Sequence, residues 1–137
     1  MDLELPFKEA PGFDGLYGLE IVSADADTVR GLVSVRDELK QPAGLVHGGV
    51  YASIAESLAS VGTAIQVMPE GKVAMGLANS TSFMRPITAG TIHGEAVVLH
   101  RGRTTWVWDV RITDDEGRLC AVTRMTVAVR EGEWSPR

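Results

Sequence analysis

The chain has 137 residues, enough for one domain with a hydrophobic core and too few for two comfortable ones. Its formal net charge of −5 argues against nucleic acid as the main partner. The single cysteine, Cys120, excludes an intrachain disulfide and a cysteine-built zinc site, and in its strand-like run we expect it to be buried and inert. The N-terminus lacks a signal-peptide pattern and no run is long enough to span a membrane, so we expect a cytoplasmic protein without membrane contact.

The first third of the chain predicts an irregular start and a hairpin. Residues 1–17 contain two prolines and several glycines, which predicts an irregular segment with at most one short helical turn. Strands are expected over 18–24 and 28–35, and the DAD sequence between them supplies a hairpin turn. Residues 37–49 are rich in turn formers and predict a loop.

One long helix is predicted from Val50 to Met68. Apolar residues recur there at spacings of three and four, namely Val50, Ile54, Leu58, Val61 and Ile65. Several alanines between them leave little bulk, so neighbouring backbone can come close to this helix. The MPEG sequence ends it, because Pro69 cannot continue a helix and Gly71 suits a turn.

The rest of the chain predicts four strands, over 73–85, 91–101, 104–113 and 118–130, and then a frayed tail over 131–137. Two strands, one helix and four strands form a single domain over 1–137. The predicted fold class is therefore α+β, with one central helix against an antiparallel sheet of about six strands. A sheet of that size covers most sides of one helix, which explains why the helix carries so little charge.

Glu56 is the exception on this apolar helix. A narrow polar stripe runs along one side of it at helical spacing: Gly49, Ser53, Glu56, Ser60 and Thr63. A carboxylate is costly to bury without a partner. The stripe therefore faces water or a partner subunit, with Glu56 a solvated charge, or it belongs to a functional site.

The helix is preceded by His47, Gly48 and Gly49, and this entrance favours the second interpretation. The first turn of a helix has free N–H groups and a partial positive charge, and the two glycines leave them unblocked. A carbonyl oxygen bound there would be polarised as in an oxyanion hole. The alternative is that the glycines only make the turn into the helix. A histidine in this position is expected to order the turn ahead of transferring a proton.

The spacing between Gly48 and Glu56 constrains any shared chemistry. Eight residues on one helix are about 12 Å apart along the axis, at ~1.5 Å per residue. The two groups of one chain therefore cannot touch the same carbonyl. A site that uses both takes its helix entrance from one subunit and its carboxylate from another, and a two-fold dimer would contain two such sites.

The segment QPAGLVHGGVYASIAESLASVGTA (41–64) resembles the helix signature of hotdog-fold acyl-CoA thioesterases, in particular the hydroxybenzoyl-CoA and phenylacetyl-CoA types. The segment over 102–129 resembles the closing hairpin of that family, and the likeness extends over residues 12–130. The resemblance implies a hotdog fold. It also implies hydrolysis of an acyl-CoA thioester, with CoA as part of the substrate and with no cofactor or metal.

The resemblance assigns roles to individual residues. Glu56 matches the catalytic carboxylate, Gly48 the backbone donor and His47 the residue that orders the turn. Gln41 matches a side chain that hydrogen-bonds near the thioester, and Ser60 a hydroxyl that places water or the carboxylate. The residues expected to contact substrate or the CoA phosphates are Gly49, Ser82, Arg85, Arg101, Arg103 and Thr104. Ser82 is included because some relatives carry a histidine on this strand and this chain does not.

The acyl group expected from this resemblance is aromatic or medium-chain. Four large residues could line its pocket, with core packing as the other interpretation: Tyr51, Phe83, Met84 and Trp106. The expected assembly is a homodimer with sites at its interface, paired further into a tetramer. Other functions left open are a hotdog enoyl-CoA hydratase or dehydratase, a non-catalytic acyl-CoA-binding module, and an interaction protein with an inactive site.

Overall fold

The computed structural model describes residues 12–133, so the expectations for 1–11 and for the end of the tail, 134–137, lie outside it. The elements are α1 (Phe13–Tyr17), β1 (Glu20–Ala24), β2 (Thr28–Ser34), η1 (Asp37–Leu39), α2 (Gly48–Val67), η2 (Met68–Glu70), β3 (Lys72–Phe83), β4 (Thr91–Arg101), β5 (Thr105–Thr113) and β6 (Leu119–Glu131).

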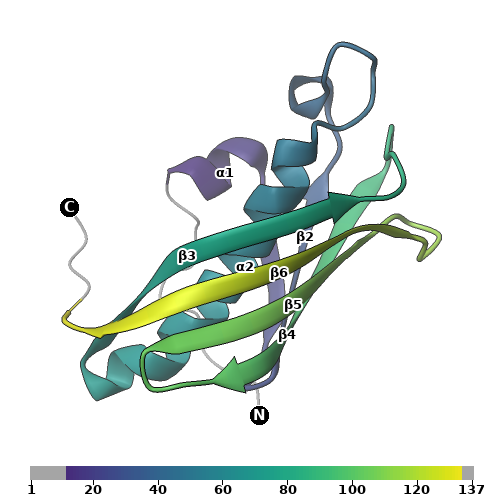
Figure 1. Cartoon of the computed structure of the whole chain (residues 1–137). Coiled ribbons are helices and arrows are strands. Elements are labelled where there is room, and N and C mark those ends of the chain that lie inside the picture. Colours follow the sequence, from purple (N-terminus) through teal and green to yellow (C-terminus); the bar gives the residue numbers. More distant parts are fainter. Residues whose placement is uncertain (1–11, 134–137) are drawn as a thin grey trace.

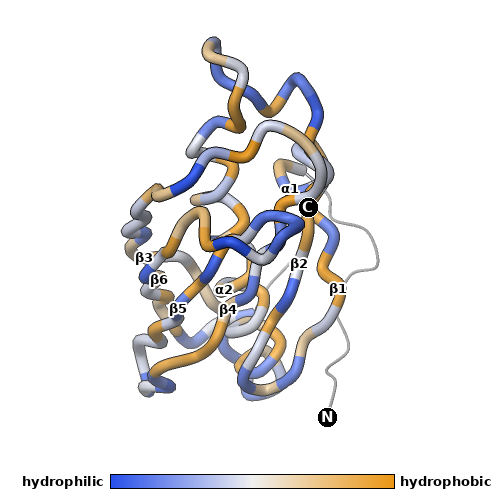
Figure 2. The backbone as a smooth tube through the Cα atoms, turned by 90° about the vertical axis from the view of Figure 1, so that its right-hand side faces the viewer, coloured by the Kyte–Doolittle hydropathy of each residue, from blue (hydrophilic) through white to orange (hydrophobic). Residues whose placement is uncertain are grey.

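The six strands form one antiparallel sheet in the order β1-β2-β4-β5-β6-β3. The sheet curves around α2, which lies against its concave face, with α1 beside α2 (Figure 1). Hydrophobic and hydrophilic residues alternate along the strands, so that one face of the sheet packs on the helix (Figure 2). The predicted α+β hotdog fold, with one long helix and six strands, is confirmed.

Helix α2 begins two residues earlier than the apolar pattern predicts, at Gly48. The His47 side chain accepts a hydrogen bond from the Gly49 N–H and so caps the first turn. The predicted stop is correct, because η2 follows with Pro69 in its first turn and Gly71 at φ 74°. Gly71 adopts the left-handed conformation that favours glycine at such an end.

The core between helix and sheet centres on Trp108 of β5. Its side chain is fully buried, and its Nε1 donates to the Thr63 hydroxyl at 2.9 Å. Gly62 makes room for the indole, because a Cβ atom there would lie 2.5 Å from the ring. Thr63 in turn donates to the Ala59 carbonyl at 2.9 Å. The prediction that Thr63 belongs to a polar stripe facing water, a partner or a site is therefore wrong. Its hydroxyl is buried and accepts a hydrogen bond from Trp108.

The N-terminal segment contains the one short helical turn that its composition allows. Residues 13–17 form helix α1, enclosed by Gly12 (φ 70°) and Gly18 (φ 84°). At the other end, β6 continues one residue beyond the expected boundary, to Glu131, which pairs with Lys72 of β3.

Cys120 is buried, as expected, and burial raises the pKa of its thiol. Within residues 12–133, no helix is long and apolar enough to cross a membrane.

Candidate active site

The entrance of α2 keeps one backbone donor free. The imidazole Nδ1 of His47 accepts from the Gly49 N–H at 2.8 Å, and the His47 carbonyl accepts from Val50 N at 2.9 Å. In the described part of the chain nothing accepts from the Gly48 N–H. Gly48 is thus the open donor. The Gly49 N–H has no side chain of its own in the way, but the His47 ring already accepts its hydrogen bond.

The absent side chain of Gly48 lets the Phe83 ring approach the helix entrance. A Cβ atom at Gly48 would lie 2.8 Å from that ring, so a larger residue would push the ring aside. Phe83 stands at the end of β3 and is more than half exposed, which leaves its ring room to move.

Glu56 lies at a cavity of about 320 Å³ formed by α1, α2 and β3. It is exposed, and within residues 12–133 it makes no hydrogen bond or ion pair. Its side chain lies next to Gly76 of β3, where a Cβ atom would be in ordinary contact with the carboxyl carbon, at 3.5 Å. The strand pairing shifts register just after this glycine, between Gly76 and Ala78. Glu56 thus has a free carboxylate beside a defined hollow.

Asn79 is a polar neighbour of Glu56 that the sequence analysis did not select. It lines the same cavity, and its Nδ2 donates to the Ala52 carbonyl on α2 at 2.9 Å. Ser82, the residue of this strand that we expected to contact substrate, is exposed and lines neither of the two cavities beside α2. Asn79 belongs to a run of polar residues on β3. Which of them reaches the cavity depends on the register of the strand, which the sequence does not give.

Helix α1 is fastened to α2 next to Glu56 by a small network, here called the Asp14 network. The Asp14 carboxylate accepts from the Ser57 hydroxyl at 2.6 Å and from the Tyr17 hydroxyl at 3.0 Å. Burial raises the pKa of the Tyr17 phenol, and its hydrogen bond with Ser57 acts in the opposite direction. Sequence reasoning missed this network, because its partners are about 40 positions apart.

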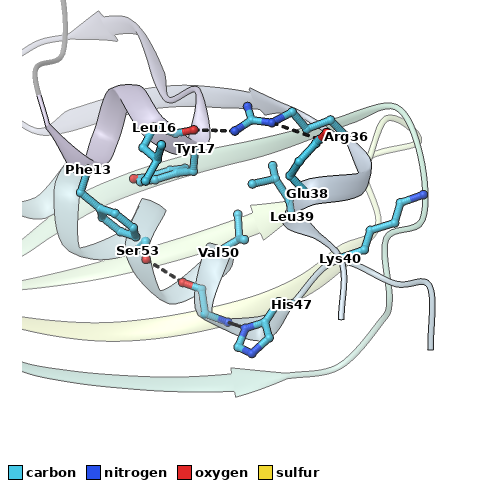
Figure 3. A pocket seen from close by; sticks show the side chains of 11 residues that line it. Phe13, Leu16, Tyr17, Arg36, Glu38, Leu39, Lys40, His47, Val50 and Ser53 are labelled. Carbon is cyan, nitrogen blue, oxygen red and sulfur yellow. Dashed lines mark hydrogen bonds and ion pairs between the residues drawn. The ribbon is translucent and has the colours of Figure 1, made fainter. Parts of the chain in front are cut away.

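A larger cavity of about 620 Å³ lies between α1, η1 and the entrance of α2 (Figure 3). Its walls include Leu16, Leu39 and Val50, and it reaches His47 at the helix entrance. This size lies within the range usual for small-molecule sites. None of the four large residues considered for an acyl pocket lines it. Tyr51 and Trp106 are buried in the core, whereas Phe83 and Met84 are exposed, so core packing is wrong for the last two.

Gln41 and Ser60 flank the site without contacting Glu56 through a hydrogen bond. The Gln41 side chain accepts from the Ala43 N–H and stays in its own loop. Ser60 is half-buried one turn beyond Glu56 and has no hydrogen bond from its side chain among residues 12–133.

The residues expected at the CoA phosphates fall into two groups at opposite ends of the sheet. Arg85 follows the end of β3 that pairs with the start of β6, whereas Arg103 and Thr104 form the turn at the far end of β5. The nine residues of β5 extend over roughly 30 Å. One chain alone therefore cannot bring both groups to one CoA.

Arg101 is already engaged within its own chain. Its guanidinium pairs with Asp27 at 2.7 Å and lies 5.6 Å from the centroid of the Trp106 ring. Binding a phosphate would require it to leave or share these partners. Among residues 12–133, no group of three or more His, Cys, Asp and Glu is placed to hold a metal.

The His47 cap predicts a separable effect on stability. His47→Ala should lower the free energy of unfolding by about 1 kcal/mol, the usual cost of losing a helix cap. His47→Asn should retain most of the stability, because asparagine caps well at this position. Urea unfolding checks both variants. Equal stability of the two would show that the hydrogen bond to Gly49 does not hold the first turn.

The sequence and the fold of this chain match those of known proteins. Residues 43–121 match the thioesterase superfamily. The Mycobacterium tuberculosis protein Rv1847 is 38% identical over 122 residues, which cover 88% of this chain and 87% of the relative. Its solved structure has a TM-score of 0.82. A 1,4-dihydroxy-2-naphthoyl-CoA hydrolase of Listeria monocytogenes is 32% identical over 120 residues, covering 88% of this chain and 97% of the relative.

A solved Staphylococcus aureus thioesterase has a TM-score of 0.83 at 28% identity and covers 85% of this chain and 97% of that one. In that structure a glutamine is replaced by alanine, and in a second structure of the same protein a glutamate fifteen positions later is replaced. Gln41 and Glu56 have the same separation here. The family match spans more than half of the chain, and the relatives align over most of it. The chain therefore belongs to the hotdog-fold thioesterase superfamily.

Proposed function

We propose that this protein hydrolyses an acyl-CoA thioester to a free carboxylic acid and CoA, with an aromatic or medium-chain acyl group. The observation that carries the proposal is that one helix presents a free backbone donor at Gly48 and, beside a cavity, an unpaired carboxylate at Glu56. The relatives support it, since one of them is named as a hydrolase of an aromatic acyl-CoA.

In the proposed reaction the thioester oxygen lies against the Gly48 N–H, which stabilises the charge that develops there. Glu56 of a second subunit attacks the carbonyl carbon directly, or takes a proton from a water that attacks it. The C–S bond then breaks, and the CoA sulfur leaves and is protonated. In the direct route, water hydrolyses the resulting anhydride and releases the acid.

A second copy of the chain is part of this proposal. Gly48 and Glu56 of one chain are about 12 Å apart along the helix axis, too far to share one carbonyl. Strand β3 is an edge strand and carries exposed apolar residues, which suits contact with another copy: Met75, Leu77 and Phe83, with Met84 just beyond. A two-fold dimer would also bring together the two groups of CoA-binding candidates. We also propose that two such dimers pair to form a tetramer.

The test is free-thiol release by the wild-type protein from a panel of aromatic and medium-chain acyl-CoAs. Steady release with multiple turnovers is the expected result. Addition of water to an enoyl-CoA without release of thiol would identify a hydratase instead. Tight binding of the same esters without turnover would identify a binding module.

A further inference from the structure

The two cavities beside α2 are neighbours separated by one large side chain. Among residues 12–133, Phe13 and Ser53 alone line both of them. The larger cavity opens at the helix entrance, and the smaller one contains Glu56. The Ser53 hydroxyl is small and donates to the Gly49 carbonyl at 2.7 Å. The bulk of the partition is therefore the Phe13 ring, which lies beside Ser53 in Figure 3.

The backbone that carries Phe13 is tied to α2, whereas most of its ring is exposed. The Asp14 network holds the next residue of α1 onto Ser57 of α2. The ring of Phe13 is 62% exposed and lies with its centroid 5.0 Å from that of Tyr17, at an interplanar angle of 55°. An aromatic ring so exposed contributes little to the core, so its replacement should alter the cavities more than the fold.

The larger cavity is suited to an uncharged, apolar group. Its charged residues lie at the rim and are engaged within the chain. Arg36 contacts the Leu16 carbonyl and Glu38, and the Lys40 ammonium lies 3.2 Å from Asp37. A cavity lined in this way gains free energy from burying hydrocarbon. Both of its described cations, Arg36 and Lys40, already have partners within the chain. Among the parts of an acyl-CoA, the acyl group fits this description.

We propose that Phe13 is a specificity-determining residue, which limits the length and bulk of the acyl group by closing the larger cavity toward the smaller one. The inference rests on the proposed thioesterase function and names the residue that sets its substrate range. Removing the ring should join the two cavities and admit longer acyl groups. Discrimination of one methylene in an apolar pocket is typically 10–200-fold, so the shift in preference should be large.

The test compares kcat/KM for hexanoyl-CoA and dodecanoyl-CoA in wild type, Phe13→Ala and Phe13→Leu. The ratio of long to short substrate should rise about tenfold or more in Phe13→Ala. The ratio should rise less in Phe13→Leu, which keeps a smaller apolar side chain. If the alanine variant is unstable, the leucine variant provides the test. Val22→Ala is the matched control, because Val22 is similarly exposed on β1 and lines neither cavity. Its ratio should equal that of wild type.

An unchanged ratio in folded, active Phe13 variants would overturn this inference and leave the thioesterase function intact. So would an equal loss of activity on both substrates, since a merely structural role predicts no change of preference. Absence of hydrolysis by wild type on every ester would instead overturn the proposed function, and this inference with it.

Discussion

Glu56→Gln should lower kcat for acyl-CoA hydrolysis by at least about a hundredfold, the usual contribution of a positioned acid or base. The amide has nearly the same shape as the carboxylate, but it neither attacks a thioester nor deprotonates water. Glu56 is exposed and forms no ion pair among residues 12–133, so the variant should unfold at the same urea concentration as wild type. Free-thiol release under saturating substrate gives the rate.

Glu20→Gln is the matched control for this experiment. Glu20 is an exposed glutamate on β1 that lines neither cavity, so its replacement changes net charge equally and should leave kcat unchanged. Equal rates for wild type and Glu56→Gln would remove Glu56 from the chemistry. Asn79 would then be the next candidate in the smaller cavity for positioning the attacking water.

Trp108→Ala should lower the free energy of unfolding by about 3–5 kcal/mol, the range found when a buried aromatic residue is cut back to alanine. The indole is fully buried against Gly62, whose missing side chain is what admits it. The indole fills the space between α2 and β5, so its removal leaves a hole that closes only if the helix moves toward β5. Removing the indole also takes away the donor to the Thr63 hydroxyl.

Urea unfolding at one fixed protein concentration measures this loss, since association would otherwise contribute to the apparent stability. Leu99→Ala is the control, because Leu99 is half exposed on β4 and its truncation should cost less than about 0.5 kcal/mol. Trp108→Phe should fall between the two. A loss below 1 kcal/mol for Trp108→Ala would mean that the core repacks around the missing ring.

The fold was predictable because the periodic patterns are long. Ile54 and Leu58 recur at helical spacing, and both are fully buried. Alternation along β5 places Trp108 and Val110 inside, as the pattern predicts. What the patterns could not supply is the effect of neighbours in space. Thr63 looks polar in sequence and is buried, because a tryptophan 45 positions later needs an acceptor.

The candidate site was predictable where it is local in sequence. His47, Gly48 and Glu56 belong to one segment, and the structure places them at the entrance and along the side of one helix. Residues brought in by other elements were not predictable. Phe13 and Asp14 come from a short helix in a glycine-rich stretch. Asn79 depends on strand register, which shifts beside Gly76.

The His47 cap also decides what the other side of its ring can do. An imidazole nitrogen accepts a hydrogen bond only through its lone pair, so with Nδ1 accepting from the Gly49 N–H the ring carries its hydrogen on Nε2. The nitrogen on the far side of the ring is therefore a donor. While the cap is in place, the ring can give a hydrogen bond to a neighbour but has no lone pair left to act as a base.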